Sequence, residues 1–190
     1  MQRMQALGAD WWNDSCDITE LSDAVATGAV GATSNPVIVS AAVKQDPDRW
    51  IPVIKELIQD NPSYSEEEIA WKLIARVGTD ASKLLLPVYE QTNGVKGHLC
   101  LQVNPKYYNN TERMVEHAKE LAALAPNIAI KAPATNAGIE AYEEMTAAGI
   151  RVNVTVSFSV AQAIAAAEAI ERGLKRAEDP DSIHPYITIM

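Results

Sequence analysis

Lys131 is the residue whose type and position in this sequence point most directly to chemistry. It lies near the end of the run 127–133, whose apolar residues and closing proline predict a short buried strand. A lysine at the end of a buried strand either finds an opposite charge or gives up its proton. An uncharged lysine amine is a nucleophile that attacks carbonyl carbons and forms a Schiff base. Schiff-base chemistry is therefore the first hypothesis for this chain.

Other polar side chains lie near the ends of predicted strands. Asp14 follows two tryptophans, Ser34 and Asn35 close the next strand-like run, and Gln102 is flanked by apolar residues. Enzymes built on parallel barrels keep their active sites at the C-terminal ends of the strands. One such residue would be weak support, but their recurrence, together with Lys131, predicts a site at that edge of a sheet.

The segment 150–157 alternates between apolar and polar residues, with Asn153 and Thr155 on the polar side. A parallel strand covered on both faces is typically apolar throughout. Two explanations remain open for this strand. Its polar face is either solvated at the edge of a sheet, or directed into the mouth of a barrel.

Short strand-like runs alternate with longer helical patterns, which is typical of βα units and a parallel sheet. The segment from Val37 to about Thr92 is helical throughout, so we expect its helices to pack outside the sheet. Asn35 is expected to cap the first of these helices, with Pro36 as its first helical residue. Ser65 and Glu68 form a capping-box pattern at the start of a later helix. Pro87 is expected to kink or end a helix.

The pattern predicts about six strands and no internal repeat or linker, hence one domain covering 1–190. The predicted strands are 9–14, 30–34, 97–103, 128–132, 150–156 and 183–190, and the predicted helices outside the long helical segment are 19–27, 110–124, 136–148 and 159–174, with Gly28, Gly149 and Gly173 as their C-terminal stops.

Composition restricts the classes of function. The chain has 190 residues, 47% hydrophobic and 22% charged, and its net charge of −9 argues against nucleic-acid binding. No apolar stretch approaches the ~20 residues of a membrane helix. Cys16 and Cys100 are too few for a disulfide framework or a zinc site, which predicts a cytoplasmic protein. His98, His117 and His184 are isolated from one another, so we expect no metal site.

Four segments of the sequence resemble the transaldolases, class I aldolase-type (β/α)8 barrels that work through a lysine Schiff base. The resemblance runs from Trp11 to the last residue, through 12–15, 31–36, 130–135 and 153–159 in the family's order. It implies that Lys131 is the nucleophile and Asp14 the catalytic aspartate. It further implies that Asn35, with Ser34, contacts the bound sugar, and that Asn153 and Thr155 are active-site positions.

Gln102 departs from this pattern, because transaldolases usually carry a glutamate there that helps to position a catalytic water. An amide can hold that water but cannot take its proton. Glutamine is also what the related fructose 6-phosphate aldolases have at this position. The substitution therefore favours aldol cleavage over transfer.

The length of the chain is the second departure. A closed (β/α)8 barrel typically takes about 250 residues, and this sequence ends within or just after the predicted sixth strand. Thr188 matches the family's phosphate-contacting serine, whereas the arginine that grips the substrate phosphate follows that strand in the family. We therefore expect an incomplete barrel with about six of its eight strands and a long helical insertion after the second strand.

The resemblance implies transfer of a dihydroxyacetone unit from fructose 6-phosphate or sedoheptulose 7-phosphate to an aldose phosphate, in the non-oxidative pentose phosphate pathway, without a metal or organic cofactor. Two alternatives remain open: cleavage of the fructose 6-phosphate aldolase type, and a catalytically silent barrel fragment that self-associates through its open sheet edge. Sugar phosphates are the expected partners, and nucleic acids and membranes are not.

Overall fold

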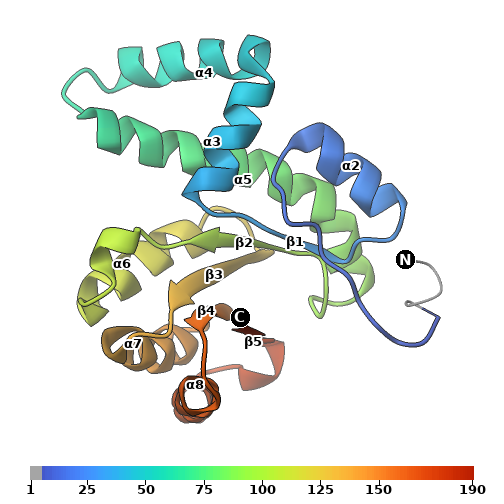
Figure 1. Cartoon of the computed structure of the whole chain (residues 1–190), viewed down its shortest axis with the longest axis vertical. Helices are drawn as coiled ribbons and strands as arrows, with labels where there is room; N and C mark the ends of the chain where they lie inside the picture. The colour runs from blue at the N-terminus through green and yellow to red at the C-terminus, as the bar shows by residue number, and fades with distance from the viewer. Residues whose placement is uncertain (1–5) are drawn as a thin grey trace. The chain divides into compact units, whose positions relative to one another are not determined.

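The computed structural model describes residues 6–190, which form an α/β fold with a five-stranded parallel sheet of the kind found in part of a (β/α)8 barrel (Figure 1). The strand order is β1-β2-β3-β4-β5. Backbone contacts divide the chain into two compact units, Met1–Leu99 and Cys100–Met190. The expectation of one domain stays a prediction, and each unit is described by itself.

Unit 1 is mainly helical, and strand β2 begins at its end. Local signals set where each helix begins: Asp17, Asn35, Asp46 and Ser65 each accept a backbone N–H of the first turn. The elements are α2 (Ile18–Ala26), β1 (Gly31–Thr33), α3 (Pro36–Gln45), α4 (Pro47–Asp60), α5 (Glu66–Gln91) and β2 (His98–Gln102).

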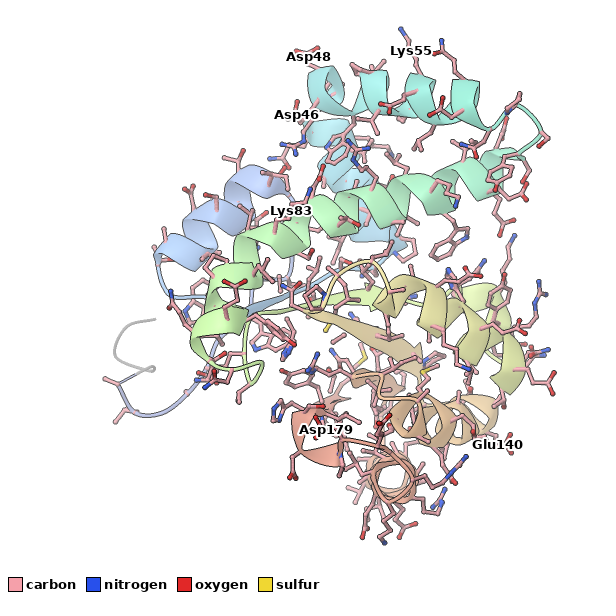
Figure 2. All side chains as sticks on the ribbon, turned by 180° about the vertical axis from the view of Figure 1, so that it is seen from behind. Asp46, Asp48, Lys55, Lys83, Glu140 and Asp179 are labelled. Carbon is pink, nitrogen blue, oxygen red and sulfur yellow. The ribbon has the colours of Figure 1, made fainter. Side chains whose placement is uncertain are left out.

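Helices α4 and α5 lie side by side and are joined by a short loop (Figure 1). Figure 2 shows Asp46 and Asp48 at the start of α4, where carboxylates complement the helix dipole. The predicted capping box of Ser65 and Glu68 is present at the start of α5. The helical segment expected from Val37 to about Thr92 is therefore confirmed as three successive helices.

Pro87 does not end a helix, contrary to one of the two outcomes expected for it. Helix α5 continues through Pro87 to Gln91. A proline removes one backbone hydrogen bond within a helix, at a cost of ~3 kcal/mol. The side chains of Val77, Ala81 and Leu85 are fully buried along the same helix, and we infer that their packing outweighs this loss.

The prediction of a first strand at 9–14 is wrong. Its segment makes only an isolated parallel bridge, between Asn13 and Ala32. The amide of Asn13 donates to the Gly31 carbonyl at 2.9 Å, and the amide of Thr33 donates to the Asn13 carbonyl at 2.8 Å. The pairing is too short to be a strand. The described residues consequently form a five-stranded sheet, not one of six strands.

Unit 2 alternates strands and helices in the predicted order. Helices α6, α7 and α8 follow one another along one side of the strands (Figure 1). β3 pairs with β4, and β4 with β5, in parallel. The elements after β2 are the 3-10 turn η1 (Pro105–Tyr107), α6 (Thr111–Ala122), β3 (Ile128–Pro133), α7 (Asn136–Ala147), β4 (Val152–Ser157), α8 (Val160–Leu174), η2 (Pro180–Ser182) and β5 (Tyr186–Ile189).

Strand β4 is buried on both faces, which excludes the solvated-edge explanation for its polar residues. Asn153 is only 3% exposed and Thr155 only 8%. Val156 breaks the expected alternation, because it is exposed and has a positive φ of 56°. The pairing of β4 with β5 shifts register between Val154 and Ser157, as at a β-bulge. The bulge turns Val156 out of the apolar face.

Gly173 allows the close approach of α8 to α7. A β-carbon at this position would lie 2.6 Å from the Glu143 carbonyl oxygen and 2.7 Å from the Thr146 β-carbon. Both atoms belong to α7 and have little freedom to move. Helix α8 ends at Leu174, as the predicted range 159–174 has it. Gly173 lies within its last turn and is not the residue that stops it.

We expect Gly173→Ala to lower the free energy of unfolding by about 1–3 kcal/mol, because overpacking costs more than the better helix propensity of alanine returns. Urea denaturation measures this. Glu168→Ala, at an exposed position of the same helix, is the control and should change stability by less than about 0.5 kcal/mol. An alanine variant as stable as the parent would contradict the close packing of α7 and α8.

Candidate functional site

The centre of the candidate site in unit 2 is the pairing of Lys131 on β3 with Asn153 on β4. These residues are direct partners in the parallel register, so their side chains leave the sheet on the same face. Lys131 is half-buried and Asn153 is buried. The register thus places an amine and a carboxamide side by side, near the C-terminal end of β3.

Asn153 is held at both ends of its amide group. Its Nδ2 donates to the Cys100 sulfur at 3.1 Å, and its Oδ1 accepts from the Thr188 hydroxyl at 2.9 Å. These partners come from β2 and β5, on opposite sides of the β3–β4 pair in the strand order. Three predicted site residues, Lys131, Asn153 and Thr188, are therefore brought together in unit 2.

Thr155 and Gln102 lie on the same face as this cluster. Thr155 is two residues after Asn153 and is the register partner of Pro133. Its hydroxyl donates to the Met190 sulfur at 3.8 Å, which is a weak contact. Gln102 is half-buried and lies two residues after Cys100, so the period of two in a strand directs both side chains the same way.

Cys100 is a residue that we did not predict from the sequence as part of the site. Its side chain is fully buried. Burial raises the pKa of the Cys100 thiol to about 11, and the Asn153 hydrogen bond and the charges of Lys131 and Arg151 offset this only in part. The thiol is thus neutral at pH 7. The sequence signal that could have identified Cys100 as a site residue is its position two residues before Gln102 in the same strand.

Lys131 has no carboxylate partner within unit 2. Ion pairs within residues 100–190 join Glu143 to Arg172 of α8 and to Arg176 just after it, Glu144 to Arg176, and Lys175 to Glu171. None of the described acidic side chains of this unit pairs with Lys131. The first of the two outcomes for a buried-strand lysine, a counter-charge, is thus not met within unit 2.

In unit 1, the structure brings Asp14 next to Thr33. Asp14 is exposed, and its carboxylate accepts a hydrogen bond from the Thr33 hydroxyl. The bridge between Asn13 and Ala32 sets this contact, because it aligns the following residues of the two segments. Thr33 lies in the segment 31–36 that resembles the family, but we did not predict it as a site residue.

Asn35 and Ser34 follow in the same segment. The Asn35 Oδ1 accepts the backbone amides of Val37 and Ile38, each at 2.9 Å, and so caps α3 as predicted. Only its Nδ2 group is left to donate outward. Ser34 is 1% exposed. Gly31, at the start of the segment, leaves room for the Trp12 ring, whose atoms would lie 2.5 Å from a β-carbon there.

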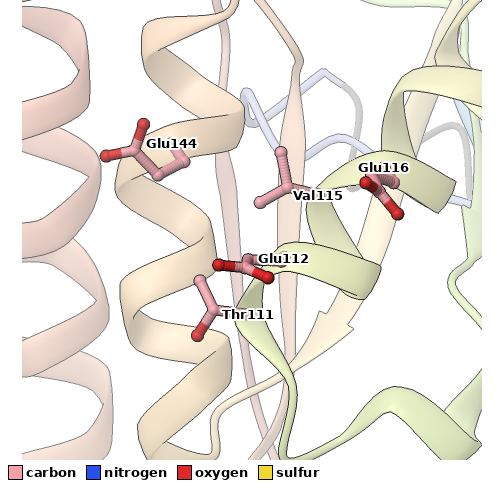
Figure 3. A pocket seen from close by; sticks show the side chains of 5 residues that line it. All are labelled: Thr111, Glu112, Val115, Glu116 and Glu144. Carbon is pink, nitrogen blue, oxygen red and sulfur yellow. The ribbon is translucent and has the colours of Figure 1, made fainter.

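A surface pocket of about 260 Å³ lies apart from these residues, between α6 and α7. Figure 3 shows the side chains that line it, Glu112 and Glu116 among those of α6 and Glu144 on α7. Glu144 is paired with Arg176, but the lining holds no basic side chain beside Glu112 and Glu116. Carboxylates repel a phosphate dianion, so this pocket does not suit a sugar phosphate.

No cluster of three or more His, Cys, Asp or Glu side chains within residues 6–190 could hold a metal ion. Over the same range, no helix has the length and apolar character needed to cross a bilayer.

Comparison with known proteins decides the family. The model of the family described as "Transaldolase/Fructose-6-phosphate aldolase" matches residues 11–188. The chain belongs to this transaldolase/fructose-6-phosphate aldolase family. The matched range includes every segment on which the resemblance was based, and Thr188 is its last residue.

Individual transaldolases are similar over most of this chain but over only half of their own length. A transaldolase from Thiobacillus denitrificans is 35% identical over 180 residues, which are 90% of this chain and 49% of the relative. Transaldolase 2 from Streptomyces avermitilis is 34% identical over 94% of this chain and 50% of its own length. A transaldolase from Neisseria gonorrhoeae is 35% identical over 91% and 50%. The chain thus spans about half the length of these relatives.

The loop that follows Gln102 in this family member is tied to α6 by a histidine. The backbone amide of Asn104 donates to the His117 Nδ1 at 3.0 Å, which requires an unprotonated nitrogen. Burial lowers the pKa of His117, and the charge of Glu120 opposes this shift. The contact therefore depends on a neutral imidazole.

We expect this contact to make folding pH-dependent. As the pH falls below about 6.5, the ordinary histidine pKa, the unfolded chain binds the proton before the folded chain does. The free energy of unfolding should then decline until the pH reaches the lower pKa of the folded state. Urea denaturation at pH 7.5 and 5.5 measures the decline. His117→Asn, whose Oδ1 is attached at the same carbon as Nδ1 and which does not titrate, should show a smaller one, and equal declines would contradict the assignment.

Proposed function

We propose that Lys131 is the Schiff-base nucleophile of a transaldolase-type reaction. The observation that supports this most directly is the register that sets Lys131 beside the buried Asn153, without a carboxylate partner in unit 2. Family membership supplies the reaction class. The proposed donor is fructose 6-phosphate or sedoheptulose 7-phosphate, the acceptor is an aldose phosphate, and the setting is the cytoplasmic non-oxidative pentose phosphate pathway.

The proposed reaction proceeds in balanced steps. The Lys131 amine adds to the C2 ketone of the donor, and loss of water gives an iminium ion. The C3–C4 bond then breaks, its electron pair moves into the iminium, and the C4 hydroxyl gives up its proton as the aldose phosphate leaves. The resulting enamine attacks the aldehyde carbon of the acceptor. Water finally hydrolyses the new iminium, which releases the product ketose and the free amine.

The other predicted residues have proposed roles in these steps. Asp14 moves protons during formation of the iminium and cleavage of the C3–C4 bond, and Asn35 and Asn153 bind hydroxyls of the three-carbon unit. Because the Oδ1 of Asn35 is engaged in capping α3, we propose that its Nδ2 is the group that meets the sugar. The remaining proposed assignments are Gln102 for the water, Thr155 for catalysis, and Ser34 and Thr188 for substrate binding.

The activity of this chain is itself a proposal, because the chain spans about half the length of its transaldolase relatives. β5 pairs only with β4 among the described strands, and it exposes Ile187 and Ile189. Such an edge favours pairing with another chain. Self-association through it, with weak or absent turnover, stays a prediction.

Treatment with fructose 6-phosphate and borohydride should leave a reduced adduct on Lys131, because reduction makes the Schiff base permanent. Peptide mass mapping locates the adduct. Lys131→Arg should abolish it, since a guanidinium stays protonated and does not condense. Lys106→Arg, which changes an exposed lysine of unit 2, is the matched control and should keep it. An unlabelled Lys131 at saturating sugar would end the proposal.

Cleavage of the fructose 6-phosphate aldolase type is the second candidate, and Gln102 is the observation that favours it. The side chain at this position lies on the site face of β2 and is an amide. It can hold a water molecule but cannot deprotonate it. In this reaction the enamine takes a proton at C3 instead of attacking an acceptor aldehyde, and water then hydrolyses the iminium to free dihydroxyacetone and the Lys131 amine.

We expect the chain to release dihydroxyacetone from fructose 6-phosphate without an acceptor. Gln102→Glu should raise the ratio of transfer to release by roughly tenfold, because it restores the residue that transaldolases usually carry at this position, where the fructose 6-phosphate aldolases have glutamine. Coupled assays with and without an aldose phosphate measure both products. Gln102→Ala, which holds no water, should not raise the ratio. An unchanged ratio in the glutamate variant would remove Gln102 as the determinant.

A further inference from the structure

We propose that Cys100 is a positioning residue, which orients the amide of Asn153 toward the substrate. The inference rests on the proposed Schiff-base function of Lys131 and names an additional residue that this function needs. It is drawn from three side chains on neighbouring strands: Cys100 on β2, Asn153 on β4 and Thr188 on β5.

The two hydrogen bonds of Asn153 define the orientation of its amide. The Thr188 hydroxyl donates to Oδ1, and Nδ2 donates to the Cys100 sulfur. A rotation of 180° would turn the NH2 group toward the hydroxyl and leave the carbonyl with the thiol S–H, which is only a weak donor. The NH2 group therefore faces β2, where the sulfur accepts one of its hydrogens.

This orientation has a consequence for substrate recognition. An amide nitrogen carries two hydrogens, and the sulfur uses one of them. The second hydrogen is on the side chain that is adjacent to Lys131 in the register. We infer that it donates to a hydroxyl oxygen of the three-carbon unit bound to Lys131.

Because this contact is buried, water does not replace the Cys100 sulfur as the hydrogen-bond acceptor of Asn153. Cys100 is 0% exposed and Asn153 is 3% exposed, so bulk water does not reach the N–H group if the sulfur is removed. A buried donor without an acceptor is destabilising, and the amide would leave its position to find another partner. The lost orientation, rather than any reaction of the thiol, is the expected defect.

The neutral state of the thiol also suits the neighbouring lysine. Burial keeps the pKa of Cys100 at about 11, so the group accepts a hydrogen bond without negative charge. A thiolate or carboxylate at this position would stabilise a protonated lysine and suppress its nucleophilicity. Cysteine therefore supplies an acceptor that leaves Lys131 without a counter-charge.

The test uses the full chain with Cys100→Ala, Cys100→Ser and Ile130→Val. The serine variant keeps a small neutral acceptor. The valine variant removes one buried methyl group from β3 on the face away from Lys131, and so matches the loss of volume. The borohydride-trapped adduct on Lys131 is followed over a range of fructose 6-phosphate concentrations, and urea denaturation records stability.

We expect Cys100→Ala to raise the half-saturating sugar concentration by roughly tenfold, the loss of about one hydrogen bond, while the maximal trapping rate stays within about threefold. Cys100→Ser should restore the concentration to within about threefold of the parent, and Ile130→Val should leave it unchanged. A nitrogen–proton correlation spectrum gives an independent readout. The Asn153 side-chain signals, identified by their loss in Asn153→Ala, should move in Cys100→Ala.

Each other outcome overturns a distinct claim. A parent chain that forms no adduct overturns the proposed function and this inference with it. A parent and a Cys100→Ala variant that trap the sugar equally well overturn the inference alone. So do unmoved Asn153 signals. An equal defect in the alanine and serine variants, in proportion to their loss of stability, shows a structural role only.

Discussion

The parallel register between β3 and β4 is the constraint on which the candidate site of unit 2 depends. Val152 and Val154 are fully buried on one face of β4, against the helices that cover it. A slip of one residue would exchange the two faces of the strand and bury polar groups among apolar side chains. The apolar face thus holds the register, and the register sets Lys131 beside Asn153. Packing on one side of the sheet thus sets which side chains lie together on the other.

The second consequence is a buried polar side chain, Asn153, whose hydrogen bonds are made within the protein. Asn153 lies too deep to be satisfied by bulk water, and it is satisfied by Cys100 and Thr188 instead. Buried polar groups are stable when their hydrogen bonds are met within the protein. These bonds hold the amide in a fixed orientation before any substrate arrives. This preorganisation is what a lysine nucleophile requires of its neighbours.

Local signals predicted a large part of the fold. The caps at Asn35 and Ser65 formed as expected, because a cap depends only on residues within one turn of the helix. The strands β2 to β5 lie inside the predicted ranges to within one residue. The failures arose where a neighbouring element intervened. Gly173 marks the close approach of α7 to α8 rather than the end of the helix, and the segment 9–14 makes one bridge rather than a strand.

The sequence by itself determined where strands and helices form and which residue is the candidate nucleophile, since these depend on periodicity, capping residues and a lysine in an apolar run. It also determined the family, through four segments of specific residue order. The tertiary structure alone decided that β4 is buried on both faces, that Val156 turns outward, and that Asn153 lies between Cys100 and Thr188. Those contacts join residues 35 to 53 positions apart. Separations of this kind carry no local signal, and only the pairing of strands reveals them.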